Sequence, residues 1–155
     1  MIFIPVILLI AADQFIKWLI QTSIELYSRF PVIDGFFYIA HTTNKGAVAG
    51  ILSGFNFVFI PLTIVFSVVI IYLILKNKNI VFRIASVLLL SGALGNFIDR
   101  VLRPDGVIDY LEFHFGQFIF PIFNMADSMI VVGSIIIGIY VLFIYKPDKV
   151  RNVES

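Results

Sequence analysis

The fold is decided by residues 95–127, which read GNFIDRVLRPDGVIDYLEFHFGQFIFPIFNMAD and lead into a long apolar run. Three acidic residues and three other polar residues stand out in this stretch: Asp99, Asp109, Asp127, Asn96, Arg100 and Asn124. Apolar segments long enough to cross a bilayer lie on both sides of it, so these groups fall where membrane spans meet a loop. We interpret the cluster as a candidate catalytic site.

The composition is that of a membrane protein. The chain has 155 residues, of which 60% are hydrophobic and 14% are charged. Ordinary soluble domains have about 45–50% apolar and about 25% charged residues. The net charge of +1 and the lack of a basic tract with interleaved aromatics give no indication of nucleic-acid binding. The chain has no cysteine, which excludes a thiol nucleophile and cysteine metal ligands on this chain.

Four apolar runs predict transmembrane helices within a single domain, residues 1–155. The expected spans are residues 2–20, 55–75, 81–98 and 126–145, and the long connections are residues 21–54 and 99–125. Basic residues gather in the connection between the second and third spans and after the fourth span: Lys76, Lys78, Arg83, Lys146, Lys149 and Arg151. The positive-inside rule therefore predicts cytoplasmic termini and two long outer loops.

The first outer loop contains signals for local structure. Residues 26–33 and 36–40 are rich in aromatic and β-branched side chains and flank Asp34-Gly35, so we expect a small hairpin. Residues 47–52 follow Gly46 and predict a short surface helix. Asn44 is typical of a turn or a helix cap, and its residue type alone leaves a role in the site open.

The charged residues inside the expected spans are predicted to lie close to one another in the membrane. Asp13 and Lys17 are four residues apart, so a helix places them on one face. A charge at the centre of a membrane helix costs about 2.5–3.5 kcal/mol, so such groups usually face the bundle interior or a watery cavity. With the amino terminus inside, the ends of spans one and three and the start of span four reach the outer face. The polar residues are therefore expected at one depth on one side.

Counting charges in this cluster leaves two acids without a basic partner. Four acids stand against two bases: Asp13, Asp99, Asp109 and Asp127 against Lys17 and Arg100. We predict Asp13–Lys17 and Asp99–Arg100 as supporting pairs. Two unpaired carboxylates in one dry pocket cannot both ionise easily, which provides a base beside an acid, as in aspartic proteases. The residues alone leave open that Asp127 is a helix N-cap and Asp109 a solvated loop acid.

Five motifs follow one another along nearly the whole chain. They are AADQFIKW at 11–18, TTNKGAVAG at 42–50, LSGALGNFIDRV at 90–101, GVIDY at 106–110 and FPIFNMADS at 120–128. Through them the chain resembles the lipoprotein signal peptidases, also called signal peptidase II. Val48 and Ala49 depart from the alanine and aromatic usual in the family, and Ile16 replaces a frequent threonine. The resemblance implies a mainly α membrane protein with four transmembrane helices and a small extracytoplasmic β-cradle.

The resemblance also implies an activity and its residues. Asp109 and Asp127 would be the catalytic aspartates of a membrane-embedded endopeptidase that uses no metal or cofactor. Nine residues would line or support the pocket: Asp13, Lys17, Asn44, Gly46, Asn96, Asp99, Arg100, Asn124 and Ala126. The substrates would be prolipoproteins in membrane lipid, cut before a diacylglyceryl-modified cysteine near the outer face of the bacterial inner membrane. Globomycin-type cyclic peptides would inhibit the reaction.

Other classes of protein are weaker interpretations. The main alternative is a small ion-coupled membrane transporter, because intramembrane Asp and Lys also mark ion pathways. A pathway would need charges at several depths, whereas here they are expected at one. A purely structural membrane subunit would not explain the cost of the unpaired acids. A metalloprotease would need an H-E-x-x-H motif, and the two histidines, His41 and His114, lie far apart.

Overall fold

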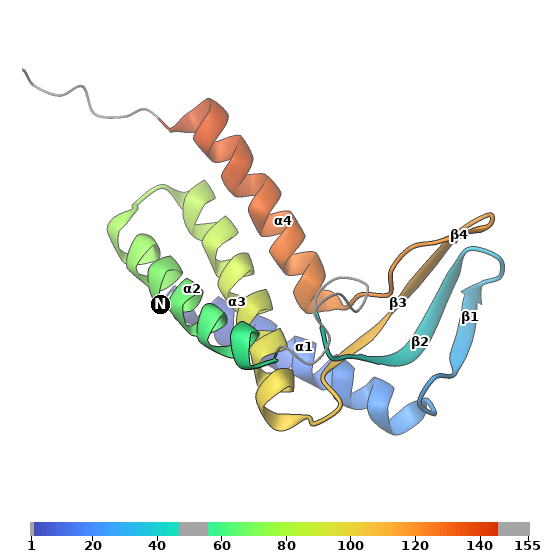
Figure 1. Ribbon diagram of the computed structural model, residues 1–155. Helices are drawn as coiled ribbons and strands as arrows, with labels where there is room; N and C mark the ends of the chain where they lie inside the picture. Colours follow the sequence, from blue (N-terminus) through green and yellow to red (C-terminus); the bar gives the residue numbers. More distant parts are fainter. Residues whose placement is uncertain (1, 47–55, 146–155) are drawn as a thin grey trace, which may run out of the picture.

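The computed structural model describes residues 2–46 and 56–145, and this part contains four helices long and apolar enough to cross a membrane. They are α1 (Phe3–Ser23), α2 (Asn56–Lys76), α3 (Ile80–Leu102) and α4 (Met125–Ile139), which continues into the π-helix η2 (Tyr140–Ile144). The helices form a bundle with a sheet at one end (Figure 1). The predicted mainly α membrane fold is confirmed.

Helix α3 lies at the centre of the bundle and packs most closely against α4. Gly92 and Gly133 make this close approach possible: a Cβ on Gly92 would lie 2.3 Å from Ala126 O, and one on Gly133 would lie 2.8 Å from Ala85 O. Small residues let membrane helices approach closely enough for extensive van der Waals contact. A buried apolar cluster joins α1, α2 and α3: Val6, Ile70, Ile74, Val87, Leu89 and Leu90.

The outer helices present apolar side chains to their surroundings. Ile7 on α1, Val68 on α2 and Ile135 on α4 are each more than half exposed. Large continuous apolar surfaces are rare on soluble monomers, whereas hydrocarbon solvates them at no cost. These faces therefore fit contact with lipid.

A four-stranded antiparallel sheet lies where α1 and α3 end and α4 begins (Figure 1). Its strands are β1 (Arg29–Ile33), β2 (Phe37–Asn44), β3 (Val107–Phe115) and β4 (Phe118–Ile119), in the order β1-β2-β3-β4. The predicted hairpin forms, with Gly35 in its turn at φ +74°. The register between β2 and β3 shifts between Ile39 and Thr42, which places Thr42 opposite Asp109.

Several observed bounds differ from the expected ones. Helix α3 continues to Leu102, whereas the third span was expected to end at residue 98. Its polar last turn stays helical because Asp99 pairs with Arg103 one turn later, at 3.1 Å. Strand β2 extends to Asn44 through a stretch expected to be irregular, and β3 lies in a segment expected to be loop. The expected surface helix at 47–52 lies outside the described residues.

Candidate active site

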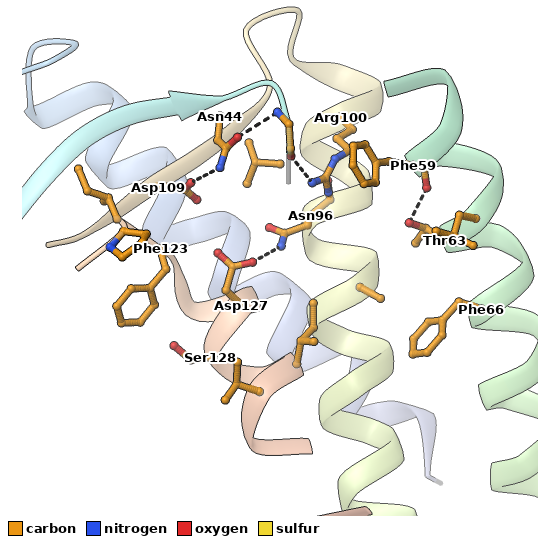
Figure 2. A pocket seen from close by; sticks show the side chains of 18 of the residues that line it. Asn44, Phe59, Thr63, Phe66, Asn96, Arg100, Asp109, Phe123, Asp127 and Ser128 are labelled. Carbon is orange, nitrogen blue, oxygen red and sulfur yellow. Dashed lines mark hydrogen bonds between the residues drawn. The ribbon is translucent and has the colours of Figure 1, made fainter. Parts of the chain in front are cut away.

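The two candidate catalytic aspartates line one cavity. Asp109 lies on β3 and is 3% exposed, and Asp127 lies in the first turn of α4. Both side chains border a cavity of about 860 Å³. Figure 2 shows them on the same side of this space, near Asn96. The topology has therefore brought together two carboxylates from separate elements, as the sequence predicted.

Amide groups hold both carboxylates in place. Asp109 Oδ1 accepts a hydrogen bond from Asn124 Nδ2 at 2.7 Å, and its Oδ2 accepts one from Asn44 Nδ2 at 3.1 Å. Asp127 Oδ1 accepts one from Asn96 Nδ2 at 2.7 Å. Within the described ranges, neither carboxylate has a cationic partner within 4.0 Å. Amides position a carboxylate without cancelling its charge, so the two acids remain available for proton transfer.

Asn124 joins the start of α4 to both acids. Its Oδ1 accepts from Asp127 N at 2.9 Å, and Asp127 Oδ2 accepts from Asn124 N at 3.2 Å, which is a reciprocal capping box. Asn124 is fully buried and also donates to Asp109. The N-cap of α4 is therefore Asn124, and Asp127 occupies the third helical position. One amide side chain sets the positions of two carboxylates.

The surroundings of Asp109 raise the pKa of its carboxyl group. Burial and, to a smaller extent, the nearby charge of Asp127 raise the pKa of Asp109 to about 7 from its ordinary value of 3.8. The amides of Asn44 and Asn124 lower the pKa of Asp109, but their effect is smaller. Asp127 lies at a helix N-terminus, where the backbone dipoles favour negative charge. Near neutral pH, Asp109 can therefore carry a proton.

A buried ionic cluster lies behind the dyad. Lys17 Nζ is 2.8 Å from Asp13 Oδ2 and 2.7 Å from Asp99 Oδ2, and all three side chains are fully buried. Lys17 also donates to Asn96 Oδ1 at 3.1 Å, and Asn96 donates to Asp127. The predicted ion pair between Asp13 and Lys17 is present. The cluster fixes the amide that orients Asp127.

The first helix also reaches the start of α4. Asp13 Oδ1 accepts a hydrogen bond from Ala126 N at 3.1 Å. Ala126 is fully buried, and a Cβ on Gly95 would lie 2.7 Å from Asp13 Oδ2. Small residues are therefore needed on α3 and α4 where Asp13 enters. This contact ties α1 to the helix that carries Asp127.

The predicted pair between Asp99 and Arg100 is wrong. Asp99 instead binds Lys17 and Arg103. Adjacent residues on a helix point in different directions, so Asp99 faces α1 while Arg100 faces the cavity. Arg100 Nη2 donates to Gly46 O at 3.2 Å, and its guanidinium lies over the Phe59 ring at 5.1 Å from the centroid.

Two supporting residues were missed by the sequence reasoning. Arg103 could have been found from its spacing of four residues after Asp99, the same spacing that identified Asp13 and Lys17. Gln14 donates to Asp99 Oδ1 at 3.0 Å and to Gly95 O at 3.1 Å. Only the crossing of α1 and α3 brings Gln14 to these acceptors, so no local signal indicated it.

Beyond the polar end, the cavity is mainly apolar. Its walls come from α2, α3 and α4: Phe59, Leu62, Phe66, Ala93, Ile130, Val131 and Val132. Figure 2 shows Phe59 and Phe66 on one side, across from the dyad. Arg100 Nε is buried at the polar end without a hydrogen-bond partner among the described residues. The cavity thus offers an apolar chamber next to two acids and a donor.

Comparisons with known proteins agree on one family. The family model described as Signal peptidase (SPase) II matches residues 5–143. The lipoprotein signal peptidase of Bacillus pumilus (strain SAFR-032) is 43% identical over 149 residues, 95% of this chain and 96% of the relative. That of Enterococcus faecalis (strain ATCC 700802 / V583) is 43% identical over 144 residues, 92% of this chain and 88% of the relative.

Solved structures show the same architecture. A bacterial membrane enzyme determined by the in meso method at 2.3 Å resolution has a TM-score of 0.85 and 36% identity, covering 96% of this chain and 92% of that one. A second, at 1.9 Å resolution, has a TM-score of 0.82 and 37% identity, covering 93% of this chain and 94% of that one. The chain is a multi-pass bacterial membrane protein that belongs to the signal peptidase II family of aspartic peptidases.

Proposed function

We propose that this protein removes the signal peptide from prolipoproteins by cutting the peptide bond before a diacylglyceryl-modified cysteine, with Asp109 and Asp127 as the catalytic pair. One observation carries the proposal: two carboxylates without a cationic partner in the described ranges border the same cavity, whose walls are mainly apolar. The relatives in Bacillus pumilus and Enterococcus faecalis are lipoprotein signal peptidases, which supports the same substrate class.

The geometry supports a general acid–base mechanism. Asp127 acts as the base and takes a proton from a water molecule, whose oxygen attacks the carbonyl carbon of the scissile bond. Asp109 is protonated and donates its proton to the carbonyl oxygen as the tetrahedral intermediate forms. The proton on Asp127 then passes to the leaving nitrogen as the C–N bond breaks, and Asp109 recovers its proton from the new carboxylic acid. Each acid is restored, and one water is consumed.

The surroundings of the pair suit a lipid-anchored substrate. The apolar walls would accept the signal segment and acyl chains, which are already in lipid and need little further desolvation. Arg100 would donate from Nε to a substrate carbonyl. Asn44 would hold Asp109 in place, and the backbone oxygen of Gly46 would hold the Arg100 guanidinium. Globomycin-type peptides would inhibit by filling the same chamber. The whole chain would act as one domain in the inner membrane, with its termini in the cytoplasm and its sheet at the outer face.

Purified enzyme in detergent micelles, incubated with lipid-modified and unmodified forms of one precursor, tests the proposal. We expect the modified form to be cut before its cysteine, and the unmodified form to be cut at least about tenfold more slowly because it lacks the acyl anchor. The Asp127→Asn variant prepared in parallel excludes a contaminating protease. Equal rates would contradict recognition of the lipid. No cleavage of either form would contradict the proposed cleavage of prolipoproteins.

The pH dependence of cleavage follows from the raised pKa of Asp109. Because Asp109 must be protonated to act as the acid, kcat/KM is expected to fall about tenfold per pH unit above about pH 7. The amide of Asn44 lowers this pKa, so Asn44→Ala should move the alkaline limb to higher pH as well as slow the reaction. A pH–rate profile of both proteins measures this, and a profile without an alkaline limb would contradict the assignment of the acid.

A further inference from the structure

A second cavity lies next to the first, inside the curved sheet. It has a volume of about 290 Å³ and is lined by residues of the first hairpin, of β3 and of the segment before α4: Tyr27, Ser28, Arg29, Ala40, Thr42, Glu112 and Ile122. Ile122 lines both cavities, and Thr42 Oγ1 donates to the backbone oxygen of Asp109 at 3.2 Å. The two cavities therefore share a wall at Ile122, and Thr42 of the second cavity contacts the backbone of Asp109.

The second cavity contains a charged group that the proposed reaction does not use. Glu112 is 4% exposed, and its Oε1 accepts from Arg29 Nη1 and contacts His114 Nε2, both at 2.6 Å. The Arg29 guanidinium stacks over the Tyr38 ring at 5.0 Å, and its side chain remains 51% exposed. Within the described ranges, Glu112 Oε2 has no hydrogen-bond partner. A buried carboxylate held in place on one oxygen thus has an acceptor to spare.

We infer that this second cavity binds the second and third residues after the cleaved bond, and that Glu112 and Arg29 set which side chains are accepted there. The inference rests on the proposed function. Thr42 lies opposite Asp109, and Ala40 lies opposite Arg29. Both β2 positions line the second cavity, on the strand segment where the register shifts between Ile39 and Thr42, and each residue of an extended substrate advances about 3.3 Å. The chain leaving the dyad therefore reaches Glu112 at its second or third residue.

The residues that line the second cavity predict which substrate side chains it prefers. Glu112 favours a side chain or backbone N–H that donates a hydrogen bond, and it repels an acidic side chain. Arg29 balances this repulsion only in part, because one of its amino groups is already bound to Glu112. Small hydroxyl residues fit beside Ser28, Ala40 and Thr42. Serine at these positions should therefore be preferred to aspartate.

Cleavage of two lipid-modified precursors that differ only at these positions tests the inference. One carries Ser-Ser and the other Asp-Asp as the second and third residues after the cleaved bond. We expect the parent enzyme to prefer Ser-Ser by about tenfold in kcat/KM. Glu112→Gln leaves Arg29 without an anionic partner and should reverse the preference. Arg29→Gln leaves Glu112 unbalanced and should widen it.

If Glu112 and Arg29 recognise substrate, the two variants change the Ser-Ser to Asp-Asp ratio of kcat/KM in opposite directions. If they have only a structural role, each variant slows the cleavage of both precursors equally and the ratio stays the same. Glu25→Gln is the matched control, because it removes one carboxylate from an exposed site beyond α1 and should keep the parent ratio. Arg29→Gln changes a half-exposed side chain and should fold. It therefore tests the inference even if Glu112→Gln does not fold. An unchanged ratio in both variants overturns the inference. A precursor truncated after its modified cysteine should still be cut, which tests the proposed function separately.

Discussion

Asp109→Asn and Asp127→Asn are each expected to lower kcat for a lipid-modified precursor by a factor of about 10²–10⁴, because each removes one partner of the proton transfer. Asparagine keeps the shape of the side chain and one of its two acceptor oxygens, so each variant keeps one of the two N–H hydrogen bonds that its aspartate accepts. Both variants should therefore fold and insert as the parent does. Single-turnover cleavage of a purified precursor, together with thermal unfolding in detergent, measures the two effects separately.

A matched variant shows whether this loss belongs to the dyad. Asp105 lies on the connection between α3 and β3, and its side chain is 71% exposed. Asp105→Asn changes the net charge by the same amount close to the site and should retain the parent rate. Full activity in either dyad variant would end the assignment of Asp109 and Asp127 as the catalytic pair.

The second large effect concerns stability. Lys17→Met is expected to lower the free energy of unfolding by about 3–5 kcal/mol, because it leaves Asp13 and Asp99 fully buried without their shared cation. Asp99 retains Arg103, so Asp13 loses more. Equilibrium unfolding of the purified protein in mixed micelles measures the difference.

The comparison for this variant is Lys78→Met. Lys78 is exposed in the short connection between α2 and α3, far along the bundle from the sheet. Its replacement should change the free energy of unfolding by less than about 0.5 kcal/mol. If Lys17→Met were as stable as Lys78→Met, Lys17 would not be holding the two buried carboxylates.

The membrane architecture could be predicted from sequence because it depends on composition and on segment length. Hydrocarbon forces each apolar run to satisfy its backbone within a helix, so four runs became four helices. The sheet was harder to predict. Val107–Phe115 alternates only weakly, since both faces of β3 are covered near Asp109 and Tyr110. Its pairing with β2 joins segments more than sixty residues apart, and no local pattern encodes such a contact.

The candidate site, like the fold, could be predicted from the sequence only in part. Spacing and topology predicted that the polar groups would gather, and the ion pair of Asp13 with Lys17 followed from helical periodicity. Charge counting failed for Asp99 because it assigned the nearest base in sequence, whereas the helix turns Arg100 toward the cavity. The part played by Asn124 in holding both acids depends on β3 lying against the start of α4. That is a tertiary contact, and only the folded structure reveals it.

The two acids lie on separate elements, so they come together only late in the insertion and folding of the chain. Asp109 is carried by the sheet and Asp127 by the last helix, and Asn124 meets both only when these parts have docked. The proposed catalytic pair is therefore incomplete in a partly inserted chain, even when most of the chain is already in the bilayer. With the proposed mechanism, cleavage begins only after the sheet has docked against the start of α4.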